Sequence, residues 1–155
     1  MKPLLRFFDV GAMLCFCAMM VCILIEVVGR NLLHLPTTWA EESSRLFCVW
    51  TVFLGAASAW HRNAHIVIHV LSTRLKGRAQ QGAQIIASVL TGIFLVSIWF
   101  GTLLIMKISY PSKTTALEIS ISYFYLGLFL GISGMVIFHF NTLLGLIRKA
   151  TGERI

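Results

Sequence analysis

Charged side chains are scarce in this sequence. They make up 12% of its 155 residues, while hydrophobic residues make up 57%. A soluble domain carries about 25% charged residues. The charge is also one-sided, because 13 Lys and Arg stand against six Asp and Glu. Such an excess can indicate nucleic-acid binding in a soluble protein. Here the apolar content makes a lipid bilayer the expected partner, and no nucleic-acid contact is predicted.

Patterns for metal binding and catalysis are missing as well. The four cysteines lie in apolar runs without CxxC or Cys/His spacing, so we interpret them as small packing residues. No nucleophile–base pair or phosphate-binding loop is recognisable. We therefore expect no catalytic, cofactor-binding or metal site, and no enzymatic activity. A metal site at His61, His65 and His69 lacks a nearby carboxylate or cysteine. The role of these histidines, and of His139, stays open.

What the sequence does contain is four long apolar runs free of proline. A bilayer core of about 30 Å takes roughly 20 helical residues to cross. The runs predict an all-α integral membrane protein with one membrane domain over residues 1–155. Its four transmembrane helices are expected at about 8–30, 39–61, 80–106 and 119–147. Residues 64–76 carry polar and apolar side chains on opposite faces, which predicts a short amphipathic helix at the membrane interface.

Lys and Arg are distributed unevenly among the connections. The side that carries both ends of the chain and the connection between the second and third helices has nine: Lys2, Arg6, Arg62, Arg74, Lys76, Arg78, Arg148, Lys149 and Arg154. The opposite side has Arg30, Arg45, Lys107 and Lys113. Positive residues favour the cytoplasmic side. Both termini are therefore expected in the cytoplasm.

The stretch PTTWAEESSRLFCVW, residues 36–50, places charges directly before an apolar run. Thr38 and Glu41 have the spacing of a capping box, and Trp39 suits a membrane interface. Arg45 lies within reach of Glu41 and Glu42. Charges that enter a membrane usually have a partner, so Glu42 and Arg45 either pair locally or contact another subunit.

Two further patterns leave alternatives open. Glu26 and Arg30 are four residues apart, which favours a local ion pair over a proton-coupling carboxylate. Small residues recur at four-residue spacing, which allows helix backbones to approach closely in lipid, within this chain or against a partner. The pairs are Ser88 with Gly92, Ser97 with Gly101, and Gly127 with Gly131.

The order of several short motifs resembles a known family. Arg30 ends the first helix and is followed by Trp39-Ala-Glu41-Glu42-Ser-Ser-Arg45, an aromatic-rich run from Phe47 to Trp50, Gly55, and His65-Ile66-Val67-Ile68. The segment ALEISISYFYLGLFLG precedes the last helix. This series resembles the small membrane subunit of tripartite ATP-independent periplasmic (TRAP) transporters, the DctQ-like family. His69 stands where that family usually has an acidic residue, and Ser120 where a proline is common.

The resemblance implies a small permease subunit in a bacterial inner membrane that transports nothing alone. It implies two protein partners, a large membrane subunit that moves substrate by a sodium-driven elevator motion, and a periplasmic substrate-binding protein. The substrate would be an organic acid, of the C4-dicarboxylate or sialic acid class, and the chain itself would need no cofactor. Candidate partner-interface residues are Arg30, Trp39, Glu41, Glu42, Arg45, Gly55 and His65.

Two other functions remain as alternatives. A membrane anchor of a respiratory enzyme would bind haem or quinone, but His139 is the only histidine inside an expected span. A small homodimeric ion-coupled exporter would depend on Glu26. Secondary transporters usually have broken helices and a polar site at mid-membrane, and this sequence predicts neither.

Overall fold

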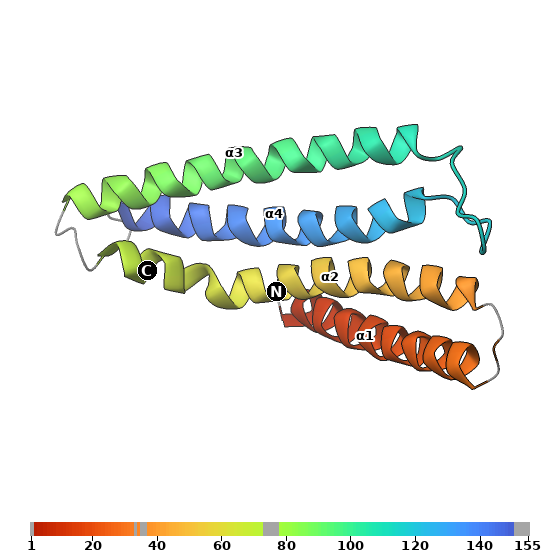
Figure 1. Cartoon of the computed structure of the whole chain (residues 1–155). Helices are drawn as coiled ribbons and strands as arrows, with labels where there is room; N and C mark the ends of the chain where they lie inside the picture. Colours follow the sequence, from red (N-terminus) through yellow and green to blue (C-terminus); the bar gives the residue numbers. More distant parts are fainter. Residues whose placement is uncertain (1, 33, 35–36, 73–77, 151–155) are drawn as a thin grey trace.

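The protein is all-helical in the computed structural model (Figure 1). The structure describes residues 2–32, 34, 37–72 and 78–150, with backbone only for residues 2, 63–72, 78–81, 83 and 146–150. Four helices form: α1 (Lys2–Asn31), α2 (Thr38–Ser72), α3 (Arg78–Ile108) and α4 (Ser122–Ala150). In the described residues the only β-pairing is an isolated bridge between Lys113 and Ser120. The all-α prediction is thus confirmed.

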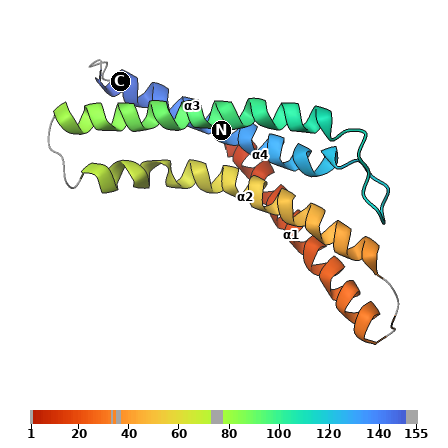
Figure 2. The ribbon, with the colours of Figure 1, turned by 45° about the horizontal axis from the view of Figure 1, so that its top comes forward.

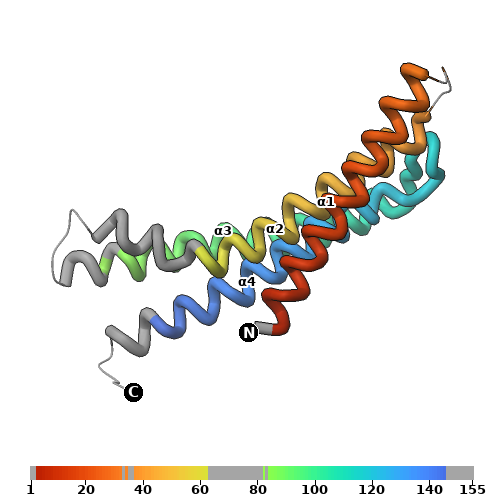
Figure 3. Tube along the Cα trace, turned by 90° about the horizontal axis from the view of Figure 1, so that it is seen from below, coloured from red at the N-terminus to blue at the C-terminus, as the bar shows by residue number. Residues whose placement is uncertain are grey.

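The helices form a row rather than a closed bundle. Figure 1 shows them side by side in the order α3, α4, α2, α1, and extensive contacts join α1 to α2, α2 to α4, and α4 to α3. Figure 2 shows α1 crossing α2 obliquely. One end of the molecule carries the last turns of α1, the start of α2 and the loop between α3 and α4 (Figure 1). Seen from below in Figure 3, the C-terminal end of α4 lies towards the opposite end.

The core lies along α2 and α4. It contains Phe8, Leu54, Ala57, Leu95, Met135 and Phe138, and the rings of Phe8 and Phe138 meet edge to face. A Cβ added to Gly131 would lie 2.5 Å from the backbone oxygen of Phe53. One added to Gly127 would lie 2.6 Å from the ring of Trp50. These two glycines therefore serve packing of α4 on α2, which answers the question that their spacing left open.

Among the described residues, three helices are long and apolar enough to cross a membrane, over Pro3–Asn31, Gln84–Ile108 and Ser122–Gly145. Helix α2 is not among them, because its apolar run reaches only from Leu46 to Trp60, shorter than the roughly 20 residues a bilayer takes. Yet α2 lies between α1 and α4, with Ala57 and Ser58 buried. A helix covered on both sides needs fewer lipid-facing side chains.

The separate interfacial helix expected over residues 64–76 is not found as such. Helix α2 runs unbroken from Thr38 to Ser72, so residues 64–72 continue it, and residues 73–77 lie outside the described part of the chain. The segment contains no proline or glycine before Gly77 that would end a helix after Arg62. The change from apolar to amphipathic sequence was interpreted as a boundary, but helical propensity continues through it.

Candidate functional site

The candidate site is the end of the molecule where α2 begins. Here Thr37, not Thr38, precedes the helix, and its carbonyl oxygen accepts hydrogen bonds from the N–H groups of Ala40 and Glu41. The expected capping box of Thr38 and Glu41 is therefore wrong, because Thr37 occupies the N-cap position and Thr38 is already the first residue of the helix. The Glu41 carboxylate instead forms an ion pair with Arg45, one helical turn away.

Glu42 reaches across to the α3–α4 loop, residues 109–121. Its Oε1 accepts hydrogen bonds from the N–H groups of Thr115 and Ala116, both at 3.0 Å, and from the Thr115 hydroxyl at 2.7 Å. Its Oε2 accepts one from the N–H of Leu117 at 2.9 Å. One carboxylate thus satisfies three successive backbone donors. The sequence left local pairing and contact with another subunit open, and did not identify this loop as the partner.

These donors stabilise the charged form of Glu42. The Thr115 hydroxyl, followed by the N–H groups of Leu117 and Ala116, lowers the pKa of Glu42 to about 2, while partial loss of hydration acts in the opposite direction. Glu42 lies four residues before the apolar run that starts at Leu46. At neutral pH the contact is a carboxylate surrounded by donors, which is the strong form of hydrogen bond.

The loop that Glu42 holds is also organised internally. The Thr114 N–H donates to the carbonyl of Ile119, and the Ile121 N–H to the carbonyl of Ser112, both at 2.9 Å. The Ser120 hydroxyl donates to the carbonyl of Tyr110 at 2.8 Å. Glu118 has a φ of 52°, a conformation that a non-glycine residue rarely adopts and that closes this turn. The loop is therefore fixed by its own bonds as well as by Glu42.

The other candidate interface residues lie on α1 and along α2. Arg30 is exposed at the end of α1, and Trp39 is 45% exposed at the start of α2. Gly55 lies deeper in α2, where an added Cβ would touch Ala12 of α1 at 4.0 Å, so it packs inside the chain. The side chain of His65 lies outside the described residues. Glu26 and Arg30 form no ion pair in the described structure, so that expected pair is wrong.

One cluster was missed by the sequence analysis. Asp9 of α1 accepts hydrogen bonds from the Ser58 hydroxyl and, at 2.7 Å, from the Arg62 guanidinium, both on α2. Ser58 is buried, whereas Arg62 is largely exposed. The available signal was that Asp9 is the only acidic residue in the first half of an apolar helix, where a charge calls for a partner. This cluster joins α1 to α2 far from Glu42.

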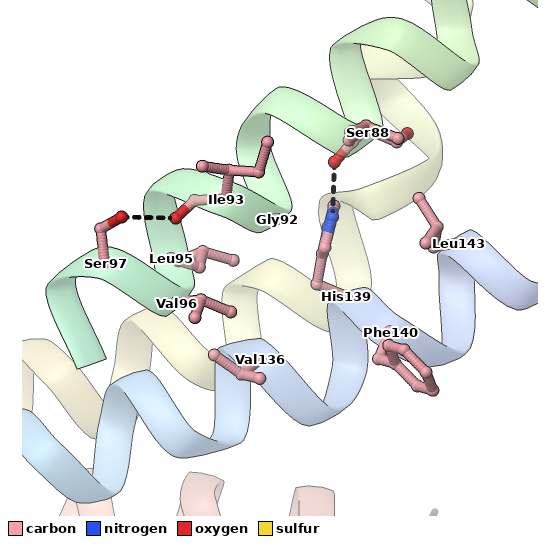
Figure 4. Close-up of a pocket in the computed structure, with 11 residues that line it drawn as sticks. Ser88, Gly92, Ile93, Leu95, Val96, Ser97, Val136, His139, Phe140 and Leu143 are labelled. Carbon is pink, nitrogen blue, oxygen red and sulfur yellow. Dashed lines mark hydrogen bonds between the residues drawn. The ribbon is translucent and has the colours of Figure 1, made fainter. Parts of the chain in front are cut away.

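His139 lies in a groove of about 370 Å³ between α3 and α4 (Figure 4). Its Nε2 is 2.9 Å from the carbonyl oxygen of Ser88, and since a carbonyl only accepts, Nε2 donates. Its ring also meets Trp60 edge to face. Apart from Ser97, the remaining lining is apolar and includes Leu95, Val96 and Val136. His139 thus makes a polar packing contact. In the described residues no three His, Cys, Asp or Glu side chains gather as a metal site, and of the three histidines 61, 65 and 69 only the His61 side chain is described.

Comparison with known proteins identifies a family for most of this chain. The model of the family "Tripartite ATP-independent periplasmic transporters, DctQ component" matches residues 19–149. No protein with curated function matches the chain. The matched range includes Glu42 and the whole α3–α4 loop, and it excludes Asp9. This family is a component of periplasmic transporters.

Proposed function

The chain belongs to the DctQ component family of TRAP transporters, where it is the small permease subunit, and we propose that it acts as a static scaffold for the large membrane subunit. The observation that carries the proposal is the row of unbroken helices with α4 packed closely on α2. The close contacts of Gly131 with the Phe53 backbone and of Gly127 with the Trp50 ring make sliding between these helices costly. A row also leaves both outer helices available for further contacts, as a support for a moving partner requires.

The same architecture supports a four-span arrangement in the bacterial inner membrane. Helix α2 would cross the bilayer between α1 and α4, its polar ends reaching the two interfaces. With both termini in the cytoplasm, Glu42 and the α3–α4 loop would face the periplasm. A cysteine substituted for the exposed Tyr110 tests this orientation. It should react with a membrane-impermeant thiol reagent added from outside, and reaction only after the cells are opened would contradict it.

We place the contact with the large subunit at a groove of about 470 Å³ beside Arg45. Helices α2 and α4 supply its apolar walls, which include Val49, Phe53, Phe124 and Leu128. Large apolar side chains on the flanks support further contact, among them Phe94 and Phe100 of α3, each more than 60% exposed. In this proposal an apolar segment of the partner fills the groove, and Arg45 meets it at the rim.

Transport itself would belong to the partners. The large subunit would couple uptake to sodium, and the periplasmic binding protein would deliver an organic acid of the C4-dicarboxylate or sialic acid class. Thermal-shift measurements of the cognate binding protein with a panel of these acids would identify the substrate. Binding of an amino acid or a neutral sugar alone would contradict the proposed class.

Co-purification is the main test of the scaffold role. A tagged chain should retain the large subunit in mild detergent, and proteoliposomes with both subunits should take up substrate only with the binding protein and a sodium gradient. The chain alone should transport nothing. Uptake by the chain alone, or loss of the large subunit during purification, would refute the proposal. In parallel, Arg45→Ala should weaken the complex with the large subunit. Arg6→Ala, at the opposite end of the molecule, should leave the complex unchanged.

A further inference from the structure

The groove between α3 and α4 has exposed apolar walls (Figure 4). Its volume is about 370 Å³, and two of its polar side chains, His139 and Ser97, already bond carbonyl oxygens of α3. The walls include four large apolar side chains that are each at least 42% exposed: Val89, Ile93, Val96 and Phe140. These walls suit an apolar ligand such as a hydrocarbon chain.

The groove lies at the depth of one leaflet of the membrane. Its residues on α3 run from Ser88 to Ser97, and the apolar span of α3 begins at Gln84. With a rise of about 1.5 Å per residue, the groove extends from roughly 6 to 20 Å inside the start of that span. Half of the hydrocarbon core of a bilayer is about 15 Å thick. The groove therefore follows the path of an acyl chain in the leaflet next to the start of α3.

The net charge of the chain belongs to this side of the membrane. The side that carries both chain ends and the connection between α2 and α3 has nine of the 13 Lys and Arg but only two acids, Asp9 and Glu153. The opposite side has four Lys and Arg and four acids, so it contributes nothing to the net charge of +7. Between Glu42 and Glu118 the sequence contains no acidic residue.

Three of these basic residues end the two helices that form the groove. Arg78 is the first residue of α3, and Arg148 and Lys149 lie in the last turn of α4. Neither helix contains Asp or Glu. Ser88 and His139 meet across the groove at 2.9 Å, and the two helices run in opposite directions. Arg78 and Lys149, each ten residues away from that contact, therefore reach the same level, about 15 Å further out.

We propose that the groove between α3 and α4 binds an acyl chain of an anionic phospholipid, whose phosphate group meets Arg78, Arg148 and Lys149 at the helix ends. Basic clusters between membrane helices bind anionic headgroups, and long Arg and Lys side chains reach the headgroup layer from a helix end. Helix α3 has extensive contact only with α4, so the lipid would fasten this outer helix along its open side. The proposal is independent of the scaffold role.

The experiment offers the purified full-length chain equal amounts of phosphatidylglycerol and phosphatidylcholine with identical acyl chains, in a neutral detergent. Native mass spectrometry then measures which lipid stays bound. The wild-type chain should retain one lipid and prefer phosphatidylglycerol by about fivefold or more, the factor that a single basic residue supplies near an anionic headgroup. Equal retention of the two lipids would overturn the proposal.

The headgroup contact is tested by two triple variants that lower the net charge equally. The first removes the basic residues at the helix ends and should abolish the preference for phosphatidylglycerol: Arg78→Gln, Arg148→Gln and Lys149→Gln. The matched control removes three basic residues from the opposite side and should keep the preference: Arg30→Gln, Lys107→Gln and Lys113→Gln. Equal loss in both variants would show that net charge alone selects the lipid, and would overturn the site.

The acyl-chain contact is tested by filling the groove. Val96→Trp places an indole ring among the groove walls and should lower the retention of both lipids by roughly threefold or more. Val21→Trp changes a similarly exposed valine on α1, away from the groove, and should match wild type. Unchanged retention in Val96→Trp would overturn the proposal. Displacement of the lipid by an equal concentration of inorganic phosphate, or its loss when the large subunit binds, would do the same.

Discussion

Gly131→Ala should loosen the contact between α2 and α4. An added methyl group would lie 2.5 Å from the backbone oxygen of Phe53 and 2.7 Å from its carbonyl carbon. Backbone atoms cannot rotate away as a flexible side chain can. The two helices must therefore separate by roughly 0.5–1 Å, and a gap of that size loses between a quarter and a half of each dispersion contact along the seam.

The magnitude follows from two opposing effects. Overpacking of a close contact costs about 1–3 kcal/mol, while replacing glycine by alanine in a helix interior gains about 1 kcal/mol. We expect a net loss of up to about 2 kcal/mol in the free energy of unfolding. Gly101→Ala is the matched control, because an added Cβ at Gly101 of α3 meets nothing within 4 Å. That variant should be neutral, or more stable by up to about 1 kcal/mol.

Both variants can be compared by reversible unfolding in mixed detergent micelles, followed by the circular dichroism of the helices. The prediction is that Gly131→Ala is less stable than Gly101→Ala. If Gly131→Ala unfolds at the same denaturant fraction as Gly101→Ala, the close approach at Phe53 is absent in the folded chain. The packing of α4 on α2 would then need revision.

Three further predictions concern polar contacts. Because the pKa of Glu42 in the folded chain is about 2, below its ordinary 4.5, its stabilisation of the loop is complete above pH 4.5 and is lost as pH falls towards 2. A spin label at position 118 should gain mobility only in that window, and a gain between pH 8 and 5 would contradict this. Asp9→Asn and Arg62→Gln should each lower the melting temperature, with a double variant less affected than the sum, whereas additive losses would show that the pair is uncoupled. Trp99→Phe should lower the free energy of unfolding by about 1 kcal/mol, because the Trp99 Nε1–H donates to the Ser133 hydroxyl at 2.9 Å. An unchanged free energy of unfolding would show that this hydrogen bond does not stabilise the fold.

The helices were predictable because their signal is local. Apolar runs without proline identify each helix. In the structure, helices α1, α3 and α4 overlap most of the predicted ranges. Which small residues pack inside the chain was not readable from spacing, because Gly127 and Gly101 belong to the same pattern. The row of helices decides it, since Gly127 faces Trp50 and Gly101 faces no other part of the described chain.

The polar contacts were less predictable because their partners are distant in sequence. Glu42 binds residues more than 70 positions away, through backbone N–H groups that any sequence would present. Asp9 and Arg62 are 53 residues apart. Glu26 and Arg30, in contrast, have the spacing of a pair and form none. Spacing along a helix tells which side chains can meet, while the docking of helices decides which do.

In a row of helices, unlike a closed bundle, the two outer helices, here α3 and α1, each have one face without a neighbouring helix. Energy terms then add along it nearly as in a linear array, each helix answering mainly to the ones beside it. Strain introduced in α3 would reach α1 mainly through α4 and α2, because α3 has only a small direct contact with α2. Either outer helix could therefore yield or tighten when a companion protein grips it, while the opposite one keeps its shape.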